Sequence, residues 1–198
     1  MRSLDLGTLL CAVAYLAFGS ANNVPTAKTE GVTYHGLHRN QIEAFLGIQY
    51  AENTGGENRF RSPIPYKHSN GSIVKAAKPG SACPQDEGLT LIPLYLGNYT
   101  DISEDCLRLN VFRPNGTNEG DRLSVMVYIH GGSFYGASKD DPNSQPAGLI
   151  LNSVANGHPV IQVQLNSRLG VFGFAKSEAL RKNALTKLQP AGTLIRYC

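Results

Sequence analysis

The stretch Leu123–Gly136, LSVMVYIHGGSFYG, decides the fold. Its first half is a mostly apolar run, typical of a strand buried on both faces in a parallel sheet. Gly131 and Gly132 follow closely, and glycines at the carboxyl end of a strand allow a bend that leaves backbone N–H groups uncovered by side chains. Ligands of open α/β sheets bind beside the carboxyl ends of strands, so we expect chemistry here. The alternative is a turn that only closes a β–α unit.

A helix and a second strand follow this stretch. Apolar residues at helical spacing predict a helix over residues 146–156, with Leu149, Ile150 and Val154 as its apolar stripe. Residues 160–165 predict a strand, and a strand–helix–strand order favours a right-handed crossover between parallel strands. Residues 107–111 alternate between apolar and polar side chains, which indicates a half-buried strand.

The flanking segments extend this prediction. Residues 31–37 and 42–50 are rich in β-formers, and we expect them to form an antiparallel ribbon at a sheet edge. Residues 51–96 favour an ordered surface loop region, because Gly, Pro, Asn and Ser recur there without a long period. Residues 177–183 predict the start of another helix. The expected fold class is α/β, with N-terminal antiparallel strands leading into a mixed, mainly parallel sheet.

The N-terminus has the pattern of a secretory signal peptide. A short basic start precedes an apolar stretch from Leu6 to Phe18 and small residues up to Ala21, so we expect cleavage after Ala21 and a secreted protein. No later stretch is long and apolar enough for a transmembrane helix. The net charge of +3 comes from scattered basic residues, which does not favour nucleic acid as a partner.

Cysteines and glycan acceptor sequences fit the secretory route. Cys11 lies in the signal peptide and Cys198 is the last residue, which leaves Cys83 and Cys106 as a natural pair. In an oxidising compartment a disulfide between them, worth roughly 3 kcal/mol, is favoured over two free buried thiols. Asn-x-Ser/Thr sequences, which accept N-linked glycans, occur among turn-forming residues. The acceptor asparagines are Asn70, Asn98 and Asn115.

Five segments of the chain resemble the type-B carboxylesterases. Residues 103–114 (SEDCLRLNVFRP) resemble the Glu-Asp-Cys-Leu signature of that family, and residues 130–134 (HGGSF) resemble its oxyanion-hole loop. Residues 166–174 (NSRLGVFGF) resemble its Asn-Tyr-Arg-Leu-Gly segment. Residues 45–51 (FLGIQYA) and 59–63 (RFRSP) also fit. The resemblance implies an α/β-hydrolase fold that cholinesterases, secreted lipases and non-catalytic cholinesterase-like adhesion proteins share, so it indicates a fold more than a substrate.

The resemblance also implies which backbone groups would take part in chemistry. The N–H groups of Gly132 and Ser133, with Gly131 in the same loop, would stabilise the negative oxygen of a tetrahedral intermediate. The implied substrate is a small-molecule or lipid carboxylic ester, hydrolysed without a cofactor or a metal. The sequence departs from the family in the glycine loop, where Ser133 replaces a glycine, and at Ser167, which replaces a tyrosine.

Two structural features of the family also map onto this chain. The resemblance implies that Cys83 and Cys106 form the family's first disulfide. It further implies an ion pair between Arg59 and Glu104, which would tie the early loop to the signature segment. We expect residues 1–21 to be the signal peptide, residues 22–183 the N-terminal part of a carboxylesterase domain, and residues 184–198 a divergent tail.

The family's catalytic triad has no counterpart in the sequence. Such enzymes carry a serine nucleophile in a Gly-x-Ser-x-Gly elbow, followed by an acid and then a histidine. No such elbow occurs, and all the histidines precede the place where it would come. We therefore expect a chain truncated before the nucleophile and inactive alone, or alternatively a non-catalytic adhesion or decoy module. The histidines are His35, His38, His68, His130 and His158.

Overall fold

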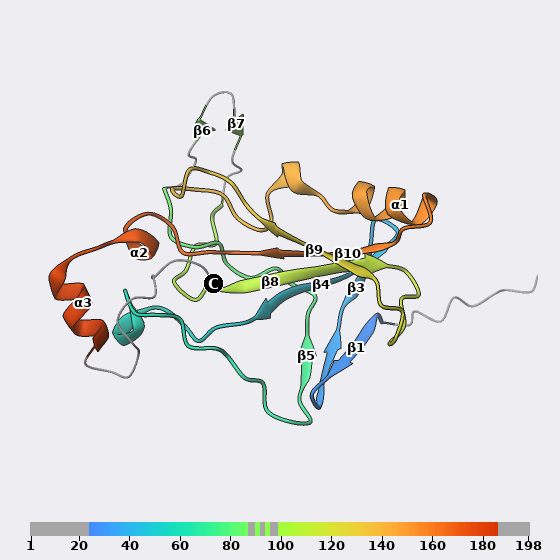
Figure 1. The fold of residues 1–198 in the computed structure, drawn as a ribbon, viewed down its shortest axis with the longest axis horizontal. Helices are drawn as coiled ribbons and strands as arrows, with labels where there is room; N and C mark the ends of the chain where they lie inside the picture. The colour runs from blue at the N-terminus through green and yellow to red at the C-terminus, as the bar shows by residue number, and fades with distance from the viewer. Residues whose placement is uncertain (1–23, 87–89, 92–93, 96–98, 186–198) are drawn as a thin grey trace, which may run out of the picture.

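The computed structural model describes residues 24–86, 90–91, 94–95 and 99–185. A five-stranded sheet forms its centre, with helix α1 above the sheet and a smaller three-stranded sheet below it (Figure 1). Helices α2 (Gly170–Phe174) and α3 (Glu178–Leu185) follow one another beyond the end of the large sheet. The expected α/β fold is confirmed. Residues 1–21, predicted to be a signal peptide, and with them Cys11, lie outside the described residues, as do Asn98 and Cys198.

The large sheet has the strand order β3–β4–β8–β10–β9. Its strands are β3 (Leu37–Arg39), β4 (Ile42–Gln49), β8 (Arg108–Pro114), β10 (Val160–Leu165) and β9 (Ser124–Ile129). The pairs β3–β4, β4–β8 and β8–β10 are antiparallel, and β10–β9 is parallel. The sheet is mixed, as expected, but its described part has fewer parallel pairs than the sequence indicated.

Helix α1 (Ala147–Ala155) connects the two parallel strands, as the strand–helix–strand order predicts. Ile150 of this helix is fully buried against Ile42, Ala44 and Phe112 of the sheet. The other two residues of the predicted apolar stripe are not buried. Leu149 and Val154 are exposed, although Val154 lies one turn from Ile150 on the same face of the helix. The predicted buried stripe is therefore corrected to one buried position.

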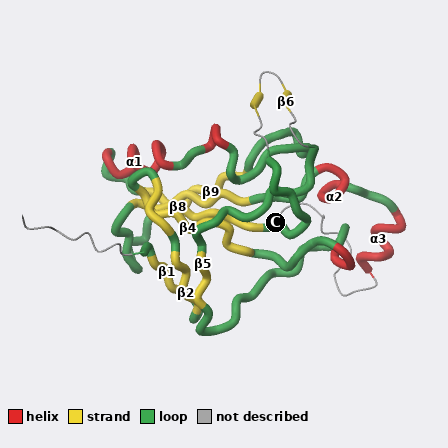
Figure 2. Tube along the Cα trace, turned by 180° about the vertical axis from the view of Figure 1, so that it is seen from behind, coloured by secondary structure: helices red, strands yellow, loops and turns green. Residues whose placement is uncertain are grey.

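The N-terminal strands pair differently from the expected ribbon. Strand β2 (Val32–His35) pairs with β1 (Thr26–Thr29) and with β5 (Ile73–Lys75), and these three form the smaller sheet (Figure 2). The hairpin partner of β4 is β3, across a two-residue turn. Asn40 and Gln41 both have positive φ there (49° and 64°), as a tight hairpin turn requires. The sequence prediction missed this turn because the turn residues include no glycine, the usual signal of a two-residue hairpin.

Strand β9 lies at the edge of the described sheet, which corrects the prediction of a strand buried on both faces. Val125, Val127 and Ile129 are each more than half exposed, and Met126 on the opposite face is 45% exposed. Apolar composition alone does not distinguish a central strand from an edge strand, because both can present the same run of residues. The described part of the structure therefore carries an apolar, unpaired sheet edge.

Short elements complete the architecture. Residues 51–86 form mainly loop, with the 3₁₀ helix η1 (Gly56–Asn58) and β5. Strands β6 (Thr90–Leu91) and β7 (Leu94–Tyr95) pair with each other, and the 3₁₀ helix η2 (Pro142–Ser144) precedes α1. Ser177 caps the start of α3, where its hydroxyl accepts a hydrogen bond from the N–H of Leu180 (3.1 Å). Among the described residues, no helix has the length and apolar character needed to cross a membrane.

Candidate functional site

The loop Gly131–Ala137 begins at the carboxyl end of β9, beside the carboxyl end of β10. Its tip is exposed at Ser133, Phe134 and Tyr135. The chain then turns back into the fold over Gly136–Lys139, which is buried and which we call the loop's return. The carbonyl of Phe134 accepts a hydrogen bond from the N–H of Gly170 (2.7 Å), which joins the loop to the start of α2. Two loops at the carboxyl ends of neighbouring parallel strands therefore meet here, where α/β folds bind ligands.

The carbonyl groups of Gly131 and Gly132 are both held by hydrogen bonds. The Nδ1 of His130 lies 2.9 Å from the carbonyl oxygen of Gly131. The carbonyl oxygen of Gly132 accepts from the N–H of Tyr135 (3.0 Å) and from the N–H of Gly136 (3.2 Å). A peptide unit is planar and trans, so its N–H points opposite to its C=O. The N–H groups of Gly132 and Ser133 are thus directed away from these contacts.

Neither of these two N–H groups donates a hydrogen bond within the described part of the chain. Gly132 is half-buried and Ser133 is exposed. An unpaired backbone donor is uncommon in a folded protein unless water or a ligand takes the hydrogen bond. The loop therefore leaves two adjacent backbone donors without an acceptor among the described residues.

Positive φ angles are concentrated in this loop. Gly132 has φ 102°, and a Cβ there would lie 1.9 Å from the carbonyl oxygen of Gly136, so only glycine fits. Ser133 and Phe134 have φ 53° and 67°, in the left-handed region that side chains with a Cβ adopt at a cost of roughly 1 to 2 kcal/mol. The serine that replaces a family glycine is therefore accommodated in a strained conformation, a kind that often marks functional sites.

His130 supports the loop as a neutral side chain. It is 8% exposed, and burial is the main cause that lowers the pKa of its imidazole. The neutral ring with its proton on Nδ1 donates to the carbonyl of Gly131. Its Nε2 has no partner among the described residues. His130 therefore acts through the backbone of Gly131, consistent with the structural role that its sequence position indicates.

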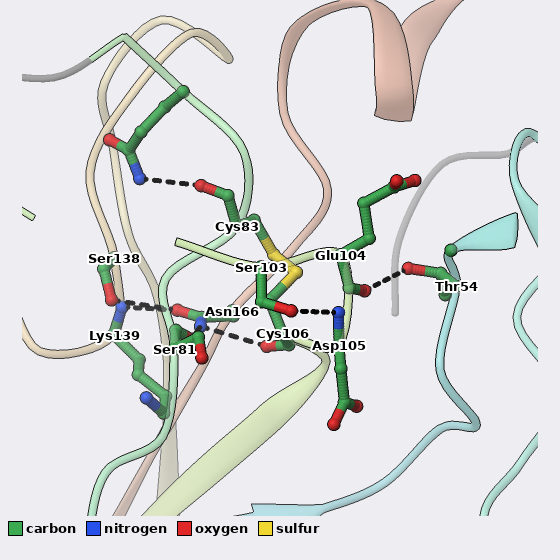
Figure 3. The surroundings of a disulfide bond; sticks show 12 residues. Thr54, Ser81, Cys83, Ser103, Glu104, Asp105, Cys106, Ser138, Lys139 and Asn166 are labelled. Atoms are coloured by element: carbon green, nitrogen blue, oxygen red, sulfur yellow. Dashed lines mark hydrogen bonds between the residues drawn. A yellow bond between two sulfur atoms is a disulfide. The ribbon is translucent and has the colours of Figure 1, made fainter. Parts of the chain in front are cut away.

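Asn166 ties the loop's return to the disulfide region (Figure 3). Its side-chain oxygen accepts from the Ser138 hydroxyl (3.1 Å) and from the Lys139 N–H (2.8 Å). Its amide nitrogen donates to the carbonyl oxygens of Ser81 (3.1 Å) and Cys106 (3.0 Å). The side chain is 1% exposed, and all its polar atoms are used. One buried amide thus connects three segments of the chain.

An ion pair between Lys139 and the partly exposed Asp140 lies at the end of the same return. The Lys139 side chain is fully buried, and its Nζ lies 2.5 Å from Asp140. Burial lowers the pKa of Lys139 despite the opposing effect of this carboxylate. Asp140 also accepts a hydrogen bond from the Asn110 side chain (2.7 Å) of β8. The return segment is therefore bound to the sheet by polar contacts, which apolar periodicity does not reveal.

Cys83 and Cys106 form a disulfide with a Cα–Cα distance of 5.0 Å, and both residues are buried. Beside it, Arg59 and Glu104 form a bidentate ion pair, with Nε–O distances of 3.0 and 2.8 Å and an Nη2–O distance of 2.5 Å. The hydrogen bond and charge of Glu104 raise the pKa of Arg59. Thr54 donates to the Glu104 carbonyl (2.6 Å; Figure 3). The early loop is therefore attached to this segment at two points.

The remaining candidate residues lie apart from the loop in the sequence. Asn70 and Asn115 are exposed, and Asn98 is outside the described residues. His68 packs edge-on against the rings of Tyr34 and Tyr66. The residues that the structure describes contain no group of three or more His, Cys, Asp or Glu side chains suited to a metal ion. Gln85, which sequence reasoning missed, contacts the loop's return through Ala137.

The chain is similar to known proteins in both sequence and structure. The profile of the carboxylesterase family matches residues 20–185. A secreted lipase of Arthroderma benhamiae is 40% identical over 183 residues, which cover 91% of this chain and 31% of the lipase. The inactive carboxylesterase-like protein VdtD of Byssochlamys spectabilis is 43% identical over 159 residues (79% of this chain, 27% of VdtD). The crystal structure of Aspergillus niger EstA has a TM-score of 0.64 at 30% identity (83% of this chain, 29% of EstA).

The matched region is less than a third of the length of each of these relatives. The structural similarity shows that the chain contains part of an α/β-hydrolase fold.

Proposed function

Because the chain belongs to the carboxylesterase family, we propose that it supplies the oxyanion-binding part of a carboxylic ester hydrolase. The observation that carries this proposal is the pair of unpaired N–H groups on Gly132 and Ser133, whose peptide planes are fixed by hydrogen bonds to the preceding and following residues. Such fixed donors stabilise the oxyanion of a tetrahedral intermediate, and removal of one typically costs roughly 3 to 4 kcal/mol of transition-state stabilisation.

The apolar surroundings of the loop support an acyl group as the bound moiety. The rings of Phe134 and Phe174 lie 4.8 Å apart between centroids, and both side chains are partly exposed. An apolar surface next to backbone donors suits a carboxylic ester whose carbonyl oxygen becomes negative during attack. We propose a small-molecule or lipid ester as the substrate class.

The nucleophile, the acid and the base are proposed to come from the part of the family's length that these residues do not match. The sequence contains no Gly-x-Ser-x-Gly elbow. The family match ends at residue 185, which supports residues 184–198 as a divergent tail. By this proposal the 198 residues alone do not turn over esters. Hydrolysis of a nitrophenyl ester by the isolated chain, blocked by an organophosphate, would refute it.

A grafted enzyme tests the oxyanion role directly. Residues 20–185 replace the matching segment of the Arthroderma benhamiae secreted lipase, and turnover of 4-nitrophenyl butyrate is measured. Gly132→Ala is expected to lower kcat on the order of 100-fold, because it displaces a loop that carries two donors. The matched control is Gly148→Ala in α1, where an added Cβ meets no atom within 4 Å. Equal kcat values in the two variants would contradict the proposal.

Secretion and glycosylation are proposed together. The sequence pattern of residues 1–21, the Cys83–Cys106 disulfide and the exposed Asn70 and Asn115 support a secreted glycoprotein. Secretion from a yeast host should give an N-terminus at Asn22 and a mass that falls after endoglycosidase treatment. A protein retained in the cell with residues 1–21 intact would contradict this.

A non-catalytic module is the second candidate function. The observation in its favour is the 43% identity to VdtD, whose name describes an inactive carboxylesterase-like protein. Sequencing the transcript beyond the codon of Asn183 separates the two candidates. An elbow followed by an acid and a histidine favours the hydrolase, whereas an elbow with its serine replaced favours the adhesion or decoy module.

A further inference from the structure

The side-chain amide of Gln85 pairs with both backbone polar groups of Ala137. Its Oε1 accepts from the N–H of Ala137 (2.8 Å), and its Nε2 donates to the carbonyl of Ala137 (3.1 Å). This is the hydrogen-bond pattern that a neighbouring strand would provide. Ala137 is 1% exposed with φ 86°, so its polar groups are buried in a strained conformation and need these partners.

Ala137 in turn packs directly against Gly132. A Cβ on Gly132 would lie 1.9 Å from the carbonyl oxygen of Gly136 and 3.2 Å from the Cβ of Ala137. The same turn is closed by the hydrogen bonds from Tyr135 and Gly136 to the carbonyl of Gly132. Because this region is packed without spare volume, a displacement of Ala137 displaces the peptide plane that orients the Ser133 N–H.

Gln85 is itself held at the disulfide. Its Nε2 also donates to the carbonyl of Cys83 (3.1 Å), and Cys83 is buried and bonded to Cys106. Asn166 fixes the other half of the disulfide through the carbonyl of Cys106. Both hydrogens of the Gln85 amide and its oxygen are therefore used, and the amide has only one orientation that satisfies these partners.

We propose that Gln85 is a positioning residue that sets the oxyanion donors of Gly132 and Ser133 through Ala137. The inference rests on the proposed function for its catalytic meaning. Gln85 does not touch the reacting atoms. Its hydrogen bonds connect the carbonyl of Cys83, which the disulfide holds in place, to Ala137 in the loop's return. Ala137 in turn contacts the turn at Gly132 that orients the two N–H groups.

The first test replaces the amide and measures the loop by NMR in the full chain. In Gln85→Leu, amide hydrogen exchange of Tyr135 and Gly136 is expected to quicken on the order of tenfold, since these N–H groups close the turn on Gly132. The resonances of Gly132 and Ser133 are expected to shift. The matched control is Gln49→Leu, which removes a single side-chain hydrogen bond to the carbonyl of Ala51. Equal exchange in the two variants would overturn the proposal.

The second test uses Gln85→Glu, whose effect depends on pH. A protonated carboxyl keeps an acceptor for the Ala137 N–H and one donor for the Ala137 carbonyl, and loses only the hydrogen bond to the Cys83 carbonyl. A carboxylate instead places a second acceptor against the carbonyl of Ala137. The resonances of Gly132 and Ser133 should therefore lie close to those of the parent protein at low pH and depart from them as pH rises through the carboxyl pKa. We expect that pKa to lie above the ordinary value of about 4.3.

A merely structural role for Gln85 would give no such titration of Gly132 and Ser133, and its absence would overturn the inference. The result of these NMR tests does not depend on the result from the grafted enzyme. A graft that keeps its kcat in Gly132→Ala would remove the oxyanion role, while the NMR result on Gln85 and Ala137 would stand.

Discussion

Replacement of Asn166 by leucine should destabilise the protein more than any exposed substitution. The change removes four side-chain hydrogen bonds and leaves the Lys139 N–H and the Ser138 hydroxyl hydrogen buried without acceptors, whereas the Cys106 carbonyl keeps the hydrogen bond from the Arg108 N–H (2.8 Å). Each such group costs roughly 1 to 3 kcal/mol, and the half-buried Ser81 carbonyl adds less. We therefore expect a loss of about 3 to 6 kcal/mol, a large share of the total stability of an ordinary domain.

Urea unfolding followed by circular dichroism measures this loss. The matched control is Asn118→Leu, because Asn118 is exposed and, among the described residues, its side-chain amide bonds only to the nearby Gly116 carbonyl. The control should change the free energy of unfolding by less than about 0.5 kcal/mol. A difference between the two variants below about 1 kcal/mol would show that Asn166 does not hold the return segment to the disulfide region.

Three further perturbations test the same region. Glu104→Gln should lower the melting temperature or the secreted yield by weakening the pair with Arg59, and the pairing is not structural if both stay unchanged. Reduction of Cys83–Cys106 should lower the free energy of unfolding by roughly 3 kcal/mol; equal urea midpoints with and without reductant would exclude this. Burial lowers the pKa of His130, so the unfolded state takes up its proton first. Stability should fall as pH drops below about 6.5, and His130→Asn should reduce that slope; an unchanged slope would contradict the assignment.

The motif segments predicted the fold well because they combine several physical signals. The β9–α1–β10 unit follows from an apolar strand, a helical period and a short connection, and its parallel pairing is as expected. The buried polar layer did not follow from the same reasoning. Asn110, Gln162 and Gln164 are buried on strands whose apolar neighbours were expected to face the core. The partners of Asn110 and Gln164 come from segments distant in sequence, which periodicity cannot indicate, and the Gln162 Oε1 has no partner among the described residues.

The candidate site was only partly predictable for a related reason. The glycine loop is visible in the sequence, because Gly131 and Gly132 directly follow a strand. Gln85 has no local signal, since its partner Ala137 lies fifty-two positions away and belongs to no regular element. Such a contact is fixed by tertiary packing alone. Its position two residues after Cys83 was the one available indication.

Amide hydrogen exchange in the parent chain tests the central claim most directly. The N–H groups of Gly132 and Ser133 should exchange near the rate of an unprotected peptide, while those of Tyr135 and Gly136 should be slowed by their hydrogen bonds to Gly132. Equal protection of all four amides would contradict the account, because it would mean that the two proposed donors are already engaged within the protein.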